Sequence, residues 1–299
     1  MEKNIETPNL RRLTSAVCRI ARSAGEYIAK EREKFSPERV ERKHAHDYVS
    51  YVDKGSEALI VGALQQLLPE AGFITEEGSA GHTDEQLLWV IDPLDGTTNF
   101  IHNYAPYAVS IALIRGREIL VGVVYEITAC ETYYAWQGGG AYMMVSDTGR
   151  TIIEQLKVSR QPTEDALLCL QLPYNSEAYK PVARHLIDTF YGRSASIRMI
   201  GSAAMALCYV AAGRLDGYAE QYIGQWDYMA GALIVAEAGG QVTDYQGSTD
   251  FTCGNSVVAT NGLTHAALLE SLTADSLLTS GTPSWQGEPG QCGCRRVHG

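Results

Sequence analysis

Residues 89–100 read WVIDPLDGTTNF, and this stretch decides how the rest of the chain is interpreted. The apolar run before Asp92 predicts a β-strand that ends there, because Pro93 has no backbone N–H with which to continue a ladder. The Asp-Gly pair at 95–96 predicts a turn that leads into a helix. Two carboxylates three residues apart across such a turn can converge on hard cations, which prefer oxygen ligands. The backbone N–H groups that follow would suit a phosphate.

Two other interpretations of this stretch are open. In the first, it is a plain connection in which Asp and Thr side chains only cap backbone groups. In the second, it is a calcium-binding loop, which fits poorly. Counted from Asp92, the sixth position is Thr97 rather than Gly, and the twelfth is Asn103 rather than Glu. The turn alone does not decide between these interpretations, and carboxylates elsewhere in the chain favour the metal site.

Length and charge limit the class of protein. The chain has 299 residues, which at roughly 150 residues per domain allows one large or two medium domains. It carries 24 Lys and Arg against 35 Asp and Glu, a net charge of −11. This surplus of acid argues against a nucleic-acid polymer as partner, because such a partner needs a basic face. A small phosphorylated substrate stays compatible, since carboxylates that hold cations reverse the local field.

No apolar run approaches the ~18 residues of a membrane span, and the first six residues lack the apolar segment of a secretory signal. Most of the seven cysteines are widely scattered, as is typical of free thiols in a reducing compartment. We therefore expect a soluble, cytoplasmic protein without a membrane partner. Cys292 and Cys294 lie in a Gly- and Pro-rich tail that we expect to be ordinary.

The pattern of apolar residues predicts mixed helices and strands. Residues 10–28 have helical periodicity, with Thr7 as the expected N-cap before Pro8, and a second helix is expected over 54–68. Strands are expected at 73–75, 87–91, 109–114, 119–125, 131–136 and 256–260, and further helices at 202–212, 227–238 and 265–272. The order predicts an α+β architecture in layers. We expect one unit over 1–280, made of two packed halves (about 1–150 and 151–280), and a disordered tail over 281–299.

Four segments together resemble the inositol monophosphatase family. Residues 92–100 (DPLDGTTNF) are similar to its main signature. The other three are 74–77 (ITEE), 225–231 (QWDYMAG) followed by 237–240 (EAGG), and 47–53 (DYVSYVD). The resemblance covers residues 10–270. It implies a layered αβαβα sandwich, a homodimer, and magnesium-dependent, lithium-sensitive hydrolysis of a small phosphate monoester.

Carried over by position, the resemblance implies a site for two or three Mg²⁺ ions. Its ligands would be Glu76, Asp92, Asp95, Asp227 and the carbonyl oxygen of Leu94. The chemistry of the residues agrees with this. Four carboxylates gathered without basic partners repel one another strongly, and cations relieve the repulsion.

The resemblance also implies catalytic roles. Glu76 and Thr97 would orient the attacking water, while Asp53 would polarise the Thr97 hydroxyl. For Asp53 an alternative is a cap on the helix expected to begin near Lys54. The phosphate would lie on the backbone N–H groups of Gly96 and Thr97.

The organic part of the substrate would contact a turn at a helix start and one carboxylate: Gly201, Ser202, Ala203 and Glu220. Ser202 can also be a plain N-cap, and the two roles are compatible. Glu220 can bind vicinal hydroxyls, or it can be a solvated residue on a strand edge.

The favoured substrate is inositol monophosphate. Fructose 1,6-bisphosphate, a 3′-phosphoadenosine nucleotide and histidinol phosphate are alternatives within the same fold. Asn103 stands where the family usually has Gly, so the loops near the substrate can differ. A non-catalytic binding protein that kept the fold is the rival from another class. The presence of all four metal carboxylates argues against it.

Overall fold

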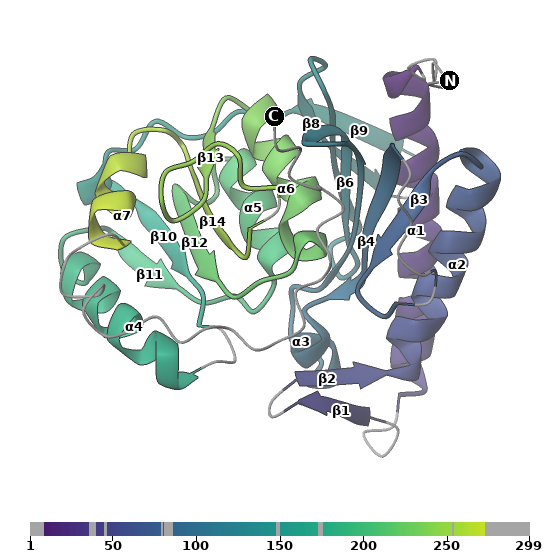
Figure 1. The fold of residues 1–299 in the computed structure, drawn as a ribbon, viewed down its shortest axis with the longest axis horizontal. Helices are drawn as coiled ribbons and strands as arrows, with labels where there is room; N and C mark the ends of the chain where they lie inside the picture. Colours follow the sequence, from purple (N-terminus) through teal and green to yellow (C-terminus); the bar gives the residue numbers. More distant parts are fainter. Residues whose placement is uncertain are drawn as a thin grey trace, which may run out of the picture.

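The computed structural model describes residues 9–35, 40–44, 47–78, 80, 86–147, 150–172, 176–252 and 254–272. Helices and sheets alternate in five layers (Figure 1). One sheet packs between an outer pair of helices and a middle pair. The second sheet packs on the other side of the middle pair and carries its own outer helices. The predicted α+β sandwich is therefore confirmed.

The larger sheet has seven strands in the order β3-β4-β5-β6-β7-β8-β9. Its strands are β3 (Gly72–Thr75), β4 (Leu87–Asp95), β5 (Ala108–Arg115), β6 (Glu118–Glu126), β7 (Glu131–Trp136), β8 (Ala141–Asp147) and β9 (Arg150–Gln155). Only β3 and β4 pair in parallel, and each later strand pairs antiparallel with the one before it. The carboxyl ends of β3 and β4 therefore reach the same edge of the sheet.

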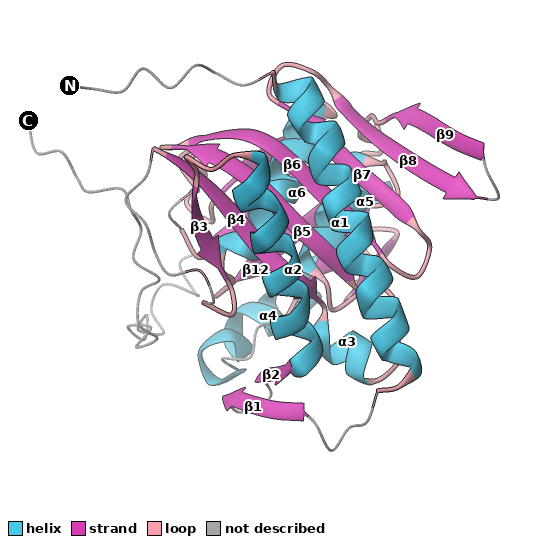
Figure 2. Cartoon of the chain, turned by 90° about the vertical axis from the view of Figure 1, so that its right-hand side faces the viewer, coloured by secondary structure: helices cyan, strands magenta, loops and turns pink. Residues whose placement is uncertain are grey.

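Two long helices, α1 (Leu10–Glu33) and α2 (Tyr51–Leu67), cover the outer face of this sheet (Figure 2). The N-cap of α1 is Asn9, whose Oδ1 accepts a hydrogen bond from the N–H of Arg12 at 3.1 Å. The predicted cap at Thr7 is therefore wrong, and Thr7 itself lies outside the described residues. A two-stranded antiparallel sheet, β1 (Val40–His44) and β2 (Asp47–Ser50), precedes α2.

The smaller sheet has the order β11-β10-β12-β14-β13. Its strands are β10 (Leu167–Leu170), β11 (Ser196–Arg198), β12 (Gly217–Gln221), β13 (Gln241–Thr243) and β14 (Ser256–Thr260). The strand β10 pairs in parallel with both β11 and β12. Helices α5 (Ala203–Ala211) and α6 (Gln225–Glu237) form the middle layer, while α4 (Ser176–Phe190) and α7 (His265–Leu272) lie outside. The helices and the strand predicted for this half are confirmed to within two residues.

Helix α6 lies directly on the backbone of the larger sheet. A Cβ atom added to Gly122 in β6 would stand 2.5 Å from the carbonyl oxygen of Ala230 in α6. At the C-terminal end of the same helix, Glu237 accepts hydrogen bonds from the N–H groups of Gly138 and Gly140, both at 2.7 Å. The helix is thus fixed both sideways and along its axis.

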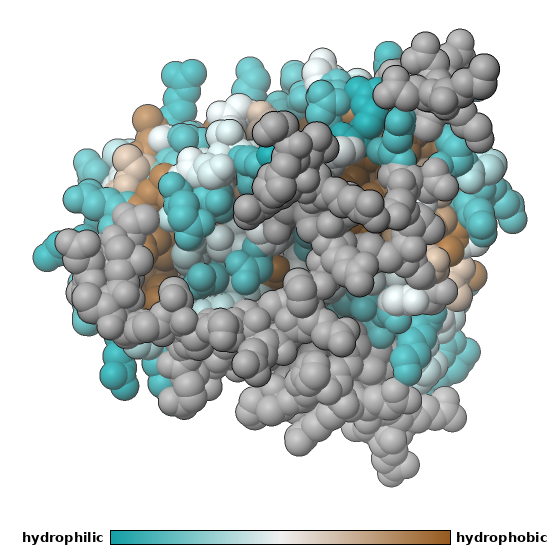
Figure 3. All heavy atoms as spheres, in the orientation of Figure 1, coloured by the Kyte–Doolittle hydropathy of each residue, from teal (hydrophilic) through white to brown (hydrophobic). Residues whose placement is uncertain are grey.

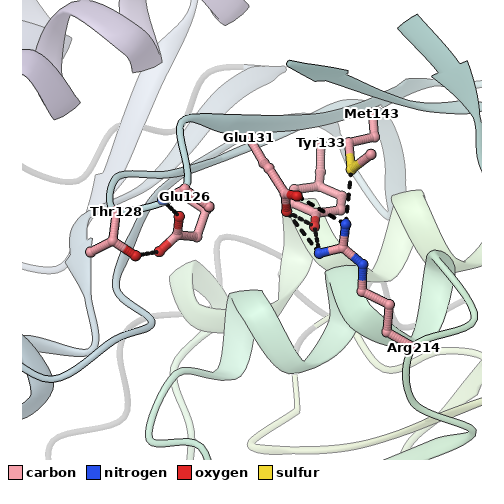
Figure 4. A network of polar contacts seen from close by, with 7 residues as sticks. Glu126, Thr128, Glu131, Tyr133, Met143 and Arg214 are labelled. Atoms are coloured by element: carbon pink, nitrogen blue, oxygen red, sulfur yellow. Dashed lines mark hydrogen bonds and ion pairs between the residues drawn. The ribbon is translucent and has the colours of Figure 1, made fainter. Parts of the chain in front are cut away.

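An ion pair between Arg214, which follows α5, and Glu131 in β7 joins the middle layer to the larger sheet (Figure 4). The guanidinium of Arg214 binds both carboxylate oxygens of Glu131 at 2.8 and 2.9 Å. It also donates to the hydroxyl of Tyr133 at 2.8 Å. Burial alone would raise the pKa of Glu131, but the hydrogen bonds from Arg214 and Tyr133 outweigh it and hold that pKa below its usual value. The pair is half-buried and bidentate, the geometry in which ion pairs contribute most.

Three of the four cysteines that the structure describes are buried. Cys18, Cys169 and Cys208 are buried free thiols, whereas Cys130 is exposed, and the other three cysteines lie outside the described residues. On the face shown in Figure 3, hydrophobic residues appear only as small areas between hydrophilic ones. Within the described ranges, no helix is long and apolar enough to cross a membrane.

The close approach of α6 to β6 gives a first prediction. Gly122→Ala should destabilise the protein by ~1–3 kcal/mol, because the added methyl group overlaps the backbone of α6. Gly62→Ala in α2 is the matched control, since a Cβ there meets nothing within 4 Å. It should stabilise by roughly 0.5–1 kcal/mol through helix propensity. Urea unfolding of the two variants measures both effects, and equal stabilities would contradict the packing described here.

Candidate functional site

A bulge in β4 brings two of the predicted carboxylates to one side. The strand does not end at Asp92 as predicted but continues through Pro93 to Asp95. Asp92 pairs with Ser110 and Asp95 with Ala108, so three steps along β4 match two along β5. In a regular strand, residues three apart point to opposite faces. The extra residue of the bulge cancels this alternation, and Pro93 lies in the bulge, where a missing N–H breaks no regular ladder.

Asp227 completes a cluster of three carboxylates. It lies in the first turn of α6, where its Oδ2 accepts a hydrogen bond from the N–H of Gly224 at 2.6 Å. One ligand oxygen each from Asp92, Asp95 and Asp227 can be chosen so that all lie within 4.8 Å of one another. Asp92 and Asp95 are buried, and Asp227 is half-buried. Elements from both halves of the chain therefore converge on one point.

Glu76 lies next to this cluster. It directly follows β3, and its backbone N–H donates to the carbonyl of Ile91 in β4 at 3.2 Å. Its carboxylate is among the charges that raise the pKa of Asp92 and Asp227. The adjacent Glu77 donates its N–H to the buried carboxylate of Glu57 in α2 at 2.9 Å. Glu57 fixes the turn after β3, and the sequence did not point to it.

Burial sets the electrostatics of the cluster. It is the largest cause that raises the pKa of Asp92 and Asp227 well above the ordinary value, and the neighbouring carboxylates raise both further. For Asp95, burial raises the pKa to about 6, although hydrogen bonds from Ser202 and the start of α5 oppose it. Burial and mutual repulsion thus disfavour the charged forms of these carboxylates when no cation is bound. A hard divalent cation such as Mg²⁺ fits this set of oxygen donors, because it supplies the compensating positive charge.

Asp95 also links the two halves directly. Its carboxylate accepts hydrogen bonds from the hydroxyl of Ser202 and from the N–H groups of Ala203 (3.3 Å) and Ala204 (3.0 Å). Ser202 Oγ in turn accepts from the N–H of Met205 at 3.2 Å, so its predicted role as N-cap of α5 is confirmed. The first turn of a helix favours a negative group, and here that group comes from the other sheet.

Thr97 and Asp53 are in contact. Thr97 opens the short helix α3 (Thr97–Ile101), and its Oγ1 lies 2.9 Å from Asp53 Oδ1 and 3.0 Å from the carbonyl oxygen of Leu94. The interpretation of Asp53 as a helix cap is wrong, because α2 begins at Tyr51 and Asp53 lies inside its first turn. Asp53 is only 1% exposed, so the Thr97 hydroxyl is an important partner for this buried charge.

The turn before α5 packs tightly against α3. Gly201 has a φ of +71°, and a Cβ there would stand 2.8 Å from Asn99 Oδ1, so the position requires glycine. The Asn99 amide group donates to the carbonyls of Pro106 and Ile200, both at 2.8 Å. No local sequence pattern points to this role for Asn99, because its partner Ile200 lies 101 residues away.

Gln171 is a third residue to which no sequence pattern pointed. It directly follows β10, is 8% exposed, and its Oε1 accepts hydrogen bonds from the N–H groups of Ile200 (3.0 Å) and Gly201 (3.3 Å). It therefore holds the turn that carries Ser202 and Ala203. A lone Gln after an apolar run is too common a pattern to have pointed to this contact.

Glu220 lies near the carboxyl end of β12. The alternative of a solvated edge residue is wrong, because β12 is the central strand, between β10 and β14. Its carboxylate accepts a hydrogen bond from the hydroxyl of Tyr218 at 2.5 Å. Burial, with a further contribution from the charge of Asp95, raises the pKa of Glu220 to about 8. Asn103, where the family usually has Gly, adopts a left-handed φ of +54°, a conformation that Asn tolerates better than most residues.

Comparisons with known proteins agree with this architecture. A sequence profile described as the inositol monophosphatase family matches residues 9–277. The chain is 38% identical to "Nus factor SuhB" of Escherichia coli over 262 residues, covering 85% of this chain and 93% of that protein. It is 35% identical to "Inositol-1-monophosphatase" of Mesorhizobium japonicum over 261 residues, covering 87% and 96%. The structure of the Thermotoga maritima IMPase matches with a TM-score of 0.77 and 29% identity, covering 90% of this chain and 98% of that one. The chain belongs to the inositol monophosphatase family.

Proposed function

We propose that this protein is a Mg²⁺-dependent phosphomonoesterase that hydrolyses a small phosphorylated metabolite. The observation that carries the proposal is the convergence of Asp92, Asp95 and Asp227 within 4.8 Å, with their pKa values raised by burial. Such a cluster stores unfavourable electrostatic energy unless cations bind to it. Membership of the inositol monophosphatase family supports the phosphatase class.

The residues that would hold two or three Mg²⁺ ions are five: Glu76, Asp92, Asp95, Asp227 and the carbonyl oxygen of Leu94. When bound, Mg²⁺ supplies positive charge for the substrate phosphate and the departing oxygen, and it lowers the pKa of a bound water. The Leu94 carbonyl oxygen lies 3.0 Å from Thr97 Oγ1 and has two lone pairs, so a ligand role is open to it.

Thr97 would position the attacking water. Because its hydroxyl proton lies toward Asp53, the Oγ1 atom has lone pairs available to accept a hydrogen bond from one O–H of a water. Glu76 would accept a hydrogen bond from the other O–H and take that one proton as the water oxygen attacks the phosphorus. Asp53 acts only through Thr97 and is a positioning residue. The backbone N–H groups of Gly96 and Thr97, at the start of α3, would hold the phosphate.

The organic part of the substrate would lie at the carboxyl ends of the parallel strands of the smaller sheet. Gly201, Ser202 and Ala203 offer a turn there, and Glu220 offers a carboxylate that can bind two neighbouring hydroxyls. This favours a polyol phosphate, with inositol monophosphate as the first candidate. Fructose 1,6-bisphosphate, a 3′-phosphoadenosine nucleotide and histidinol phosphate stay as alternatives.

The working form in this proposal is a cytoplasmic homodimer. The three buried free thiols Cys18, Cys169 and Cys208 support a reducing compartment. A second candidate function comes from a relative named "Nus factor SuhB", and it would use the fold as a binding protein without turnover. This candidate does not require the acidic cluster, which is what distinguishes it from the phosphatase.

Phosphate release from a panel of the four candidate monoesters tests the proposed function. We expect Mg²⁺-dependent turnover that Asp95→Asn abolishes, because the neutral amide cannot hold the cation. Asp188→Asn, an exposed change of the same kind in α4, is the matched control and should keep full activity. If no ester on the panel is hydrolysed by the native protein with Mg²⁺, the binding protein becomes the better proposal.

The contact between Thr97 and Asp53 gives a second prediction on activity. Thr97→Ala should lower kcat by about 10²–10⁴-fold, the range for a group that assists proton transfer, with little change in KM. Thr97→Ser keeps the hydroxyl and should restore most of the rate. Steady-state kinetics of both variants at saturating Mg²⁺ separate this role from a structural one. A Ser variant as slow as the Ala variant would refute the role of the hydroxyl.

The raised pKa values predict how metal-free protein responds to pH. The pKa of Asp95 is raised to about 6 and that of Glu220 to about 8, so the folded state binds more protons than the unfolded state between about pH 4 and pH 8. Stability must then fall as pH rises through this window, by ~1.4 kcal/mol per pH unit for each extra proton bound.

Thermal unfolding in EDTA measures this effect. The Tm should fall from pH 5 to pH 8, and Mg²⁺ should raise it far more at pH 8 than at pH 5. Glu220→Gln should make the fall shallower across the window from about pH 4.5 to pH 8, since it removes the extra proton that folded Glu220 binds over that range. A Tm in EDTA that is independent of pH across the window would contradict the electrostatics described for the site.

A further inference from the structure

The outermost strand of the larger sheet is open along one edge. β9 (Arg150–Gln155) stands at the end of the strand order and pairs with β8 on its inner side. All six of its residues are exposed. Figure 2 shows the β8–β9 hairpin extending beyond α1, away from the helices that cover the rest of the sheet. Among the described residues, no strand pairs with the other edge of β9, so this free edge presents backbone N–H and C=O groups to the outside.

This edge has only part of the usual protection against pairing. Sheet edges are normally blunted by a proline, a bulge or charged side chains. Of these, β9 has only two charges, Arg150 and Glu154, and they are of opposite sign. β9 contains no proline, and it pairs with β8 in regular register from Tyr142↔Gln155 to Asp147↔Arg150. Ile152 and Ile153 are 66% and 58% exposed, and as neighbours in a strand they lie on opposite faces. A second strand placed here would cover an isoleucine on each face.

We propose that the free edge of β9 pairs antiparallel with the same edge of a second copy of this chain, across a two-fold axis at Ile152. The two-fold axis is perpendicular to the sheet, so a side chain lies on the same face of the sheet in both copies. Side chains on one face of a strand are an even number of residues apart, so the two residues of each pair must also be an even number of positions apart. Arg150 then faces Glu154 of the second copy, and the reverse pair forms by symmetry. Ile152 faces its own equivalent, while Thr151 faces Ile153 of the second copy.

The charges select this register. With the axis at Ile153, Ile152 would face Glu154, and Arg150 would lie beyond the end of the partner strand. With the axis at Thr151, Arg150 would face Ile152, and Glu154 would have no opposite residue in the strand. Within one chain Arg150 and Glu154 are four residues apart along an extended strand, or ~13 Å, too far to pair with each other. Their opposite charges are therefore complementary between copies.

The expected association is weak and reversible. Cross-strand pairs of opposite charge contribute roughly 0.2–1 kcal/mol each. A six-residue strand also covers less than the ~800 Å² per partner of a standard interface. We therefore expect the association to appear only at high protein concentration, where two molecules that each have an unpaired β9 combine and the mass doubles.

Charge reversal with mixing tests the proposal. Arg150→Glu alone places Glu opposite Glu at both ends of the pairing, and Glu154→Arg alone places Arg opposite Arg. Neither variant should associate through β9. An equimolar mixture restores both opposite-charge pairs, so it should recover the mass of the native assembly. Sedimentation velocity on the native chain, each variant and the mixture, up to ~200 μM, measures this.

The mixture also serves as its own control for folding. In its own chain Arg150 lies opposite Asp147 and Glu154 opposite Met143, so each reversal changes its own hairpin in the same way alone and mixed. Only the partner differs. Equal masses for the native chain and both variants at every concentration would overturn the proposal. So would a mixture that associates no better than its components.

Discussion

The mutual repulsion of buried carboxylates is the constraint on which the rest of this structure depends. Asp92 and Asp95 come from a bulge in β4, Asp227 from the first turn of α6, and Glu76 from the end of β3. Nothing in their own chemistry would bring them together, because burial and proximity both penalise their charged forms. They are held in place by packing and hydrogen bonds that lie outside the cluster. The cluster is therefore ready for cations before any cation binds.

Helix α6 transmits most of that restraint. At its start Asp227 accepts from Gly224, and the hydroxyl of Ser110 in β5 donates to the carbonyl of Trp226 at 3.1 Å. At its end Glu237 closes the turn before β8. Between these points the helix packs against Gly122 of β6, where no side chain separates the two backbones. The middle layer thus aligns the larger sheet with the smaller one, and the hydrogen bonds of Asp95 to α5 join them a second time.

The sequence pattern predicts which acidic residues form the candidate site, but not the bulge and the hydrogen bonds that orient them. Apolar alternation and turn residues were enough for the antiparallel strands and the helices of the second half. The sequence pattern predicts a strand end before Pro93, because a local pattern cannot reveal a bulge that depends on the register with β5. It leaves an edge position open for Glu220, because the order β10-β12-β14 in the sheet is not the order along the chain. Gln171 and Asn99 bind backbone groups distant in sequence, and such contacts leave no local signal.

The hydrogen bonds of Asp95 to α5 have a consequence for the newly made chain. Ser202 is 107 residues beyond Asp95, so Asp95 emerges from the ribosome long before its partners. During that interval the first half has its strands but no helix turn to bind this carboxylate and no α6 to supply Asp227. Contacts of such long range form late in folding, since loop closure must come first. The acidic cluster therefore assembles only after Asp227 and α6, within the last third of the chain, have been made.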